Sequence, residues 1–189
     1  MKIHGTAKGG AISKKDFGVA FGGVPAVECD DYGPTSQDNQ QDLDSTLRNY
    51  SLKMLDGFSL IGCKIATAKW YVRAGSSTIP DGNMYSTLYD SAGNVRDTSA
   101  AVNMSGLTTG FQWIEFSFSS PETVASDDYI SFTAGYDDAP GATNGWIQCG
   151  RDSSGAPETV ELWIGGSGSP DDITQESAGR QPSLELIPD

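Results

Sequence analysis

Apolar and polar residues alternate along the middle of the chain, and residues 111–118 show this pattern most clearly. Because successive side chains of a β-strand point to opposite faces, this segment divides into two sets. The set predicted to face the core is Gln112, Ile114, Phe116 and Phe118. The set predicted to face outward is Phe111, Trp113, Glu115 and Ser117. The pattern therefore predicts an amphipathic strand with an outward-facing tryptophan.

Similar short runs, separated by turn signals, occur along the rest of the chain. The further strands that they predict are residues 61–72, 83–89, 95–98, 101–104, 128–133, 146–149, 159–164 and 184–187. Residues 90–94 include Gly93 and predict a hairpin loop, whereas the almost wholly polar residues 36–44 predict a surface loop. Several strands at regular spacing, with no helical period between them, predict an all-β fold: an antiparallel β-sandwich in residues 25–189.

The central segment resembles jelly-roll modules of the carbohydrate-binding or lectin-like kind. The resemblance rests on residues 70–72, a Pro-Asp-Gly turn at 80–82, and residues 85–95, 107–116 and 126–132. Residues 8–21 likewise resemble the start of small virus-associated proteins. Such modules occur in phage and archaeal-virus structural proteins and in secreted microbial proteins. The resemblance implies a jelly-roll sandwich and no particular reaction.

The chain is strongly acidic. Its 25 aspartates and glutamates outnumber its 12 lysines and arginines, which gives a net charge of −13. Phosphate contacts require basic side chains, so this composition disfavours nucleic acid and anionic membranes as partners. No apolar run has the length needed to span a bilayer, so no membrane insertion is expected.

Residues 1–24 form a separate segment that is basic and rich in glycine. Four lysines occur here, and no acidic residue precedes Asp16. One interpretation is a disordered tail that leads into the first strand. The other is an extended assembly arm that docks on an acidic neighbour. The residues predicted to make the contacts of this arm are Lys14, Lys15, Phe17, Val19 and Phe21.

The cysteines and the first residues bear on where the protein works. Cys29, Cys63 and Cys149 form an odd number, and the start of the chain lacks the apolar core of a signal peptide. These features favour buried thiols in a protein assembled inside a cell, with one disulfide as the alternative. A virion protein fits, since it is made in the host cytoplasm and works outside. The alternative location is extracellular.

The sequence offers little for catalysis. Its only histidine, His4, lies in the N-terminal segment, which leaves no oriented base for a nucleophilic triad. The cysteines lack the paired spacing of a zinc site. Glu115 stands alone on its strand, whereas jelly-roll glycosidases usually carry closely spaced glutamates. We therefore expect no enzymatic activity.

Two kinds of binding site remain as candidates. Exposed aromatic rings stack on sugars, and the candidates for a glycan site are Trp113, Trp146, Tyr85 and Tyr89. Carboxylate and amide oxygens bind Ca²⁺, and the candidate ligands are Asp137, Asp138 and Asn144 in a turn-rich loop. Acids also gather in residues 30–44, without the spacing of a calcium loop. The alternatives are core packing for the aromatics and a solvated surface for the acids.

Together these features predict a non-enzymatic structural protein of a virus particle, one that decorates a capsid or belongs to a tail or spike. It would assemble as a homo-oligomer, with capsid or tail proteins as partners, through residues 1–24. The alternative is a carbohydrate-binding module for attachment to a host or a glycan matrix. A polysaccharide hydrolase domain is the weaker alternative.

Overall fold

The computed structural model describes residues 28–33, 37–44, 46–136, 145–153, 157–165, 173–175 and 180–189. Several predicted site residues lie outside these ranges: Lys14, Lys15, Phe17, Val19 and Phe21 of the arm, and Asp137, Asp138 and Asn144 of the cation site. Within the described ranges, no helix is long and apolar enough to cross a membrane.

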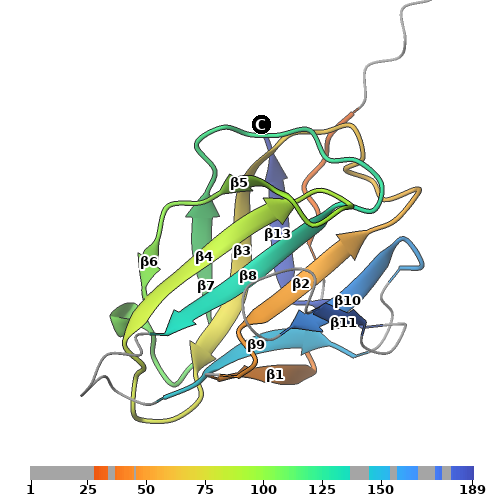
Figure 1. The fold of residues 1–189 in the computed structure, drawn as a ribbon. Helices are drawn as coiled ribbons and strands as arrows, with labels where there is room; N and C mark the ends of the chain where they lie inside the picture. The colour runs from red at the N-terminus through yellow and green to blue at the C-terminus, as the bar shows by residue number, and fades with distance from the viewer. Residues whose placement is uncertain are drawn as a thin grey trace, which may run out of the picture.

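Two antiparallel sheets pack against each other (Figure 1). Among the described residues, the first sheet contains β1 (Asn39–Leu43), β3 (Ile65–Ala74), β7 (Gln112–Ser117), β9 (Ile147–Asp152), β12 (Gln181–Pro182) and β13 (Leu184–Pro188). The second contains β2 (Asn49–Met54), β4 (Gly82–Tyr89), β5 (Val95–Thr98), β6 (Val102–Asn103), β8 (Tyr129–Tyr136), β10 (Val160–Gly165) and β11 (Ile173–Gln175). A short 3₁₀ turn, η1 (Met104–Gly106), follows β6. The predicted all-β antiparallel sandwich is confirmed.

Strand β3 is the centre of the first sheet. β7 pairs with one edge of β3, and β13 and β9 pair with successive parts of the other edge. Val72 shows that β7 and β9 lie on opposite edges, because it pairs with both Gln112 and Cys149. β1 lies beyond β9, and Tyr32 forms a bridge with Leu186 of β13. The second sheet runs in the order β5, β4, β8, β2, β10 and β11.

Trp70 on β3 lies at the centre of the core between the sheets. Its side chain is completely buried, and its ring lies 5.8 Å from Phe132 and 6.2 Å from Tyr50, centroid to centroid. The indole Nε1 donates a hydrogen bond of 3.1 Å to Ser86 Oγ, which satisfies a polar group that would otherwise be costly to bury. The neighbours of Trp70 on β3, Lys69 and Tyr71, consequently point outward.

Strand β7 has the two faces that its sequence predicts. Phe116 and Phe118 are 1% and 7% exposed, and Ile114 packs against the core from a half-buried position. On the opposite face Trp113 is 47% exposed. The predicted division into core and outer residues is confirmed for these positions.

The loop after β4 is the predicted hairpin connection to β5. Asp90 Oδ1 accepts hydrogen bonds from the backbone N–H groups of Ala92 and Asn94, at 2.9 and 2.8 Å, and Gly93 takes a φ of 84°. A side-chain hydrogen bond from Asn94 is the main reason why the pKa of Asp90 is lowered. Glycine adopts this left-handed conformation without the steric cost of a Cβ.

Several strands differ from the prediction: β2, β11 and β12 were not predicted, and β8 and β9 each extend three residues further than predicted. β3 begins at Ile65 rather than at residue 61, because Leu60 to Cys63 form a turn in which Gly62 has a φ of 89°. Residues 39–43, predicted to lie in a loop, form the strand β1. Its five residues all pair with β9, and only Leu43 is buried. Backbone pairing holds such a strand at the edge of a sheet without an alternating apolar pattern.

The prediction of three buried thiols is wrong for two of the cysteines. Cys29 and Cys63 form a disulfide, which ties the first described residues to the turn before β3. Cys149 is the only free cysteine, and it is buried on β9. Burial raises the pKa of its thiol well above the ordinary value. The odd count reflected one bridge and one core residue.

The hydroxyl groups of two largely buried tyrosines form hydrogen bonds between separate segments of the chain. Tyr136 donates to the carbonyl oxygen of Leu43 and accepts from the N–H of Ile147 at 3.0 Å, which joins β8 to β1 and β9. Tyr32 donates to Gln181 Oε1. Burial is the main cause that raises the pKa of both phenols far above the ordinary value near 10.

We therefore expect the protein to lose stability in alkaline solution. A tyrosine ionises near pH 10 in the unfolded chain and only at higher pH in the folded one. The contribution of the neutral phenols to the free energy of unfolding is therefore complete below about pH 10. Above this pH it is lost by about 1.4 kcal/mol per pH unit for each phenol. Urea unfolding between pH 8 and 11.5 measures this effect. In the variant Tyr136→Phe, the slope of the free energy of unfolding against pH should be smaller by the contribution of one phenol. A free energy of unfolding that stays flat above pH 10 would contradict it.

Candidate functional site

The outer face of the first sheet carries three aromatic rings in contact. Tyr71 of β3 pairs with Trp113 of β7, and their ring centroids lie 4.9 Å apart at an interplanar angle of 37°. Phe111, just before β7, stacks on the other side of Tyr71 at 5.0 Å and 20°. We call Phe111, Tyr71 and Trp113 the aromatic platform. It arises because odd-numbered residues of both strands point away from the core.

A glycine of the neighbouring strand makes room for the central ring of the platform. A Cβ atom added to Gly150 on β9 would lie 3.0 Å from each of three atoms, namely Tyr71 Cδ1, Gln37 Cγ and Ser183 Oγ. Such contacts are tighter than ordinary packing allows. The missing side chain therefore leaves room for the ring of Tyr71 against β9.

A row of polar side chains continues from the platform across the sheet. The guanidinium carbon of Arg73 lies 4.5 Å from the ring centroid of Phe111. Arg73 donates to Gln148 Oε1 at 2.7 Å and to Gln40 Oε1 at 2.9 Å, and Gln148 donates to Asp42 Oδ1 at 2.7 Å. These side chains come from β3, β9 and β1. Their mutual hydrogen bonds fix them in place beside the aromatic rings.

Trp146 lies at the far end of the same face. The N–H of Gly75 donates to the carbonyl oxygen of Trp146 at 2.8 Å, which extends the pairing of β3 with β9 one step beyond Ala74 and Ile147. A Cβ added to Gly75 would lie 1.9 Å from Trp146 Nε1, so the indole covers this glycine directly. Its side chain remains 37% exposed. Gly75, the partner of Trp146, follows β3 directly and lies four residues, and therefore about 13 Å along the strand direction, from Tyr71 of the platform.

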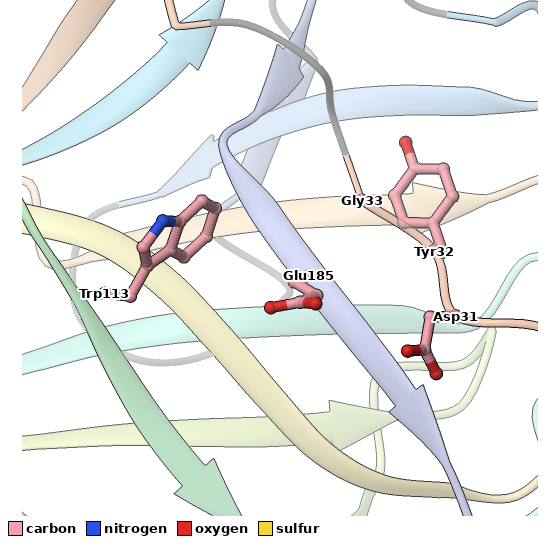
Figure 2. A pocket seen from close by; sticks show the side chains of 5 residues that line it. All are labelled: Asp31, Tyr32, Gly33, Trp113 and Glu185. Carbon is pink, nitrogen blue, oxygen red and sulfur yellow. The ribbon is translucent and has the colours of Figure 1, made fainter.

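A hollow adjoins the platform at Trp113 (Figure 2). Its volume is about 300 Å³, and it is lined by Asp31, Tyr32, Gly33, Trp113 and Glu185. In Figure 2 Glu185 of β13 lies between Trp113 on one side and the segment of Asp31 to Gly33 on the other. Glu185 also forms an ion pair of 3.3 Å with Lys69 of β3.

The structure separates the four aromatic residues predicted to bind a ligand. Trp113 and Trp146 share the outer face of the first sheet, whereas Tyr85 and Tyr89 lie on β4 in the second sheet. Tyr89 is only 6% exposed, and burial raises the pKa of its phenol. The half-buried Tyr85 packs against Gly135, where an added Cβ would lie 3.3 Å from its ring. Neither tyrosine adds to the first face.

The outer face of the second sheet also carries aromatic side chains, and they contact one another. Tyr129 and Trp163 meet edge to face at 5.8 Å. Lys53 Nζ lies 5.6 and 5.7 Å from their ring centroids and 2.7 Å from Asp127 Oδ1. Trp163 Nε1 donates to Glu161. This arrangement contributes to packing over β2, β8 and β10.

Several of the acidic side chains in residues 30–44 accept hydrogen bonds from other residues of the chain. Asp38 accepts from the N–H and hydroxyl of Ser153, and these bonds lower its pKa. Asp44 accepts from the hydroxyl of Thr46 and from two backbone N–H groups, with the same direction of shift. Asp42 accepts from Gln148. No group of three or more potential metal-binding side chains occurs among the residues that the structure describes.

The sequence did not identify Tyr71, Phe111, Arg73 and Gln148 as a group. The alternation of the two strands placed Tyr71 opposite Trp70 and Phe111 beside Trp113 on one face. It could not show that β3 pairs with β7, which brings the rings together, or that β9 pairs with β3. No family model, curated protein or solved structure matches this chain.

Proposed function

We propose that the protein is a non-catalytic glycan-binding β-sandwich, and that the outer face of its first sheet holds the ligand. The observation that carries this proposal is the aromatic platform of Phe111, Tyr71 and Trp113, which continues directly into the polar row of Arg73, Gln148 and Asp42. Sugar rings present apolar C–H faces and a rim of hydroxyls. A surface that offers stacked rings beside fixed hydrogen-bonding groups complements both.

The length of the face supports an oligosaccharide rather than a single sugar. Trp113 and Trp146 are both exposed. Their partners, Tyr71 on β3 and Gly75 directly after it, are four residues apart, which is about 13 Å along the strand direction. The polar row lies between them. A chain of several sugar units can therefore stack at both ends. In the middle, the exposed Asp42 and the half-buried Arg73 offer hydrogen bonds, while Gln148, which is 7% exposed, holds them in place.

A hydrolase is the less favoured reading of the same face. Glycoside hydrolysis requires two carboxyl groups, one of which is protonated when it acts as the acid. Asp31 and Glu185 both line the hollow, but Asp31 is exposed and Glu185 is paired with Lys69. Neither carboxyl lies in the apolar pocket that the catalytic acid of such an enzyme occupies.

We expect Trp113→Ala to weaken glycan binding by roughly tenfold or more, since buried aromatic anchors contribute most of the energy of such contacts. A glycan array followed by calorimetry with the best ligand measures this effect. Tyr85→Ala, on the opposite sheet, is the matched control and should leave affinity unchanged. Absence of binding to any glycan, or affinity unchanged by Trp113→Ala and Trp146→Ala together, would overturn the proposal.

A structural role in a virus particle is the second proposal, supported by strand order. Tyr32, β13, β3 and β7 are adjacent in one sheet, and β2, β8, β4 and β5 in the other. This order, with the chain crossing between sheets, supports a jelly-roll arrangement in which the segment of Tyr32 would take the place of one strand and β9 to β12 would be an insertion. Jelly rolls occur in both viral capsid and lectin domains. The disulfide supports a protein that works outside the reducing cytoplasm.

Deletion of residues 1–16 tests this second role. Loss of oligomerisation or of binding to particles, with unchanged glycan affinity, would support an arm that assembles the protein separately from its ligand face. Unchanged assembly would remove the role of the arm and leave glycan binding as it stands.

A further inference from the structure

The hollow beside Trp113 differs in charge from the rest of the ligand face. Three carboxylates surround it or lie next to it: Asp31, Glu185 and Glu115. Lys69 is the cation placed among them, since it pairs with Glu115 on β7 and with Glu185 on β13 in the strand register. Three negative charges against one positive charge leave this end of the face locally acidic.

Lys69 already forms an ion pair, whereas the carboxylate of Asp31 forms none with the described residues. Lys69 Nζ lies 3.3 Å from Glu185 Oε2, and their side chains are 26% and 36% exposed. The side chain of Asp31 has no hydrogen bond or ion pair with any residue in the described part of the chain, and it is exposed beside the hollow. Arg73, the nearest other cation on β3, is held by Phe111, Gln148 and Gln40.

Trp113 provides a second attraction for positive charge. Its indole is 47% exposed and forms one wall of the hollow, opposite the segment that carries Asp31 (Figure 2). Among aromatic side chains, tryptophan binds cations over its ring face most strongly. A carboxylate and an indole on two sides of one hollow thus favour the same kind of group.

We propose that this hollow binds an ammonium group carried on a sugar, so that the protein selects glycans with free amino groups over their N-acetylated counterparts. The inference rests on the proposed glycan-binding function and names the chemical class of its ligand. A protonated amino sugar stacks on the platform as a neutral sugar does. In addition, its ammonium lies between Trp113 and the carboxylates of Asp31 and Glu185. A uronic acid at this position would meet like charge.

The test compares glucosamine oligomers with N-acetylglucosamine oligomers of equal length by calorimetry, in mildly acidic buffer where the amines are protonated and aspartate remains ionised. We expect the glucosamine oligomer to bind at least about fivefold more tightly, from one cation–π contact and one exposed ion pair. Asp31→Asn should reduce this preference, because it removes the ion pair and keeps the cation–π contact, and it should leave binding of the acetylated oligomer intact. Glu158→Gln, which removes an exposed charge from the turn before β10, is the matched control.

The outcomes distinguish failure of the ammonium site from failure of the proposed glycan-binding function. Equal affinity for both oligomers, or a preference that is undiminished in Asp31→Asn, would overturn the ammonium site and leave glycan binding standing. A preference that is undiminished in Trp113→Ala would show that the net charge of the protein attracts the amines, and would also overturn the site. Failure of both oligomers and of every other glycan to bind would overturn the proposed function as well.

Discussion

Replacement of Cys29 and Cys63 by serine should lower the free energy of unfolding by about 3–4 kcal/mol. The bridge closes a loop of 34 residues, and a crosslink over this length removes that much conformational entropy from the unfolded chain. It is the covalent link between the first described residues and the turn before β3, where Cys63 is 1% exposed. Urea denaturation of the double variant at neutral pH measures the loss.

The third cysteine supplies the control for this prediction. Cys149→Ala removes the buried free thiol and keeps the bridge, so it should cost only about 1 kcal/mol for the lost sulfur contacts. A reducing agent should lower the stability of this variant and of the original protein equally. A double serine variant as stable as the original would mean that the bridge does not form or does not constrain the chain.

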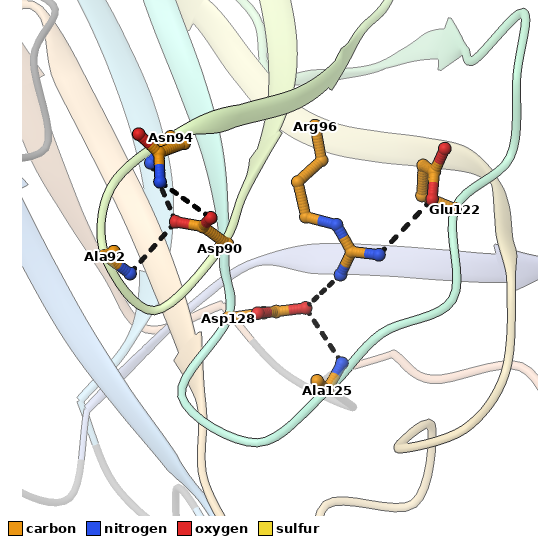
Figure 3. A network of polar contacts seen from close by, with 7 residues as sticks. All are labelled: Asp90, Ala92, Asn94, Arg96, Glu122, Ala125 and Asp128. Carbon is orange, nitrogen blue, oxygen red and sulfur yellow. Dashed lines mark hydrogen bonds and ion pairs between the residues drawn. The ribbon is translucent and has the colours of Figure 1, made fainter.

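Loss of Arg96 should cost about 3 kcal/mol. Arg96 of β5 donates to Asp128 Oδ2 at 2.6 Å and to Glu122 Oε2 at 3.3 Å (Figure 3). The carboxyl of Asp128 is 3% exposed, and its Oδ2 also accepts a hydrogen bond from the N–H of Ala125 at 2.8 Å. Arg96→Met would leave a buried carboxylate without its counter-charge, which is costly in proteins. The side chain of Arg96 is 25% exposed, which places the effect at the lower end of that range.

A double-mutant cycle separates the ion pair from other losses. Arg96→Met, Asp128→Asn and the double variant are compared by urea denaturation, and a coupling of at least about 1 kcal/mol is expected between two residues in direct contact. Lys69→Met is a useful comparison, because its partner Glu185 is 36% exposed and the pair should contribute little. Additive effects at Arg96 and Asp128 would contradict the assignment.

The alternation of residues along single strands was enough to predict local features. It gave the buried and outer faces of residues 112–118 because the side-chain period of a strand is two. It gave the hairpin at residues 90–94 because Asp90 and Gly93 occupy positions that favour a tight turn. Trp113 was predicted to face outward for the same reason, and it is one of the three rings of the aromatic platform.

Features that depend on which strands meet were beyond single-strand patterns. The aromatic platform exists because β7 pairs with β3 in a register that sets Tyr71 beside Trp113. The disulfide depends on the return of Tyr32 to β13, which brings Cys29 toward the turn before β3. β1 is held by pairing with β9, and its own residues carry little hydrophobic signal. Tyr85 and Tyr89 share a face of their strand, but that strand lies in the other sheet.

The four tryptophans provide the most direct test of a ligand face on the first sheet. Trp113 and Trp146 lie on that face, Trp70 is in the core, and Trp163 lies on the outer face of the second sheet. In an NMR titration with the glycan selected by the array, we expect the indole N–H signals of Trp113 and Trp146 to shift with one common dissociation constant, while those of Trp70 and Trp163 stay in place. A shift confined to Trp163, or no indole shift with a glycan that binds, would contradict a ligand site on this face.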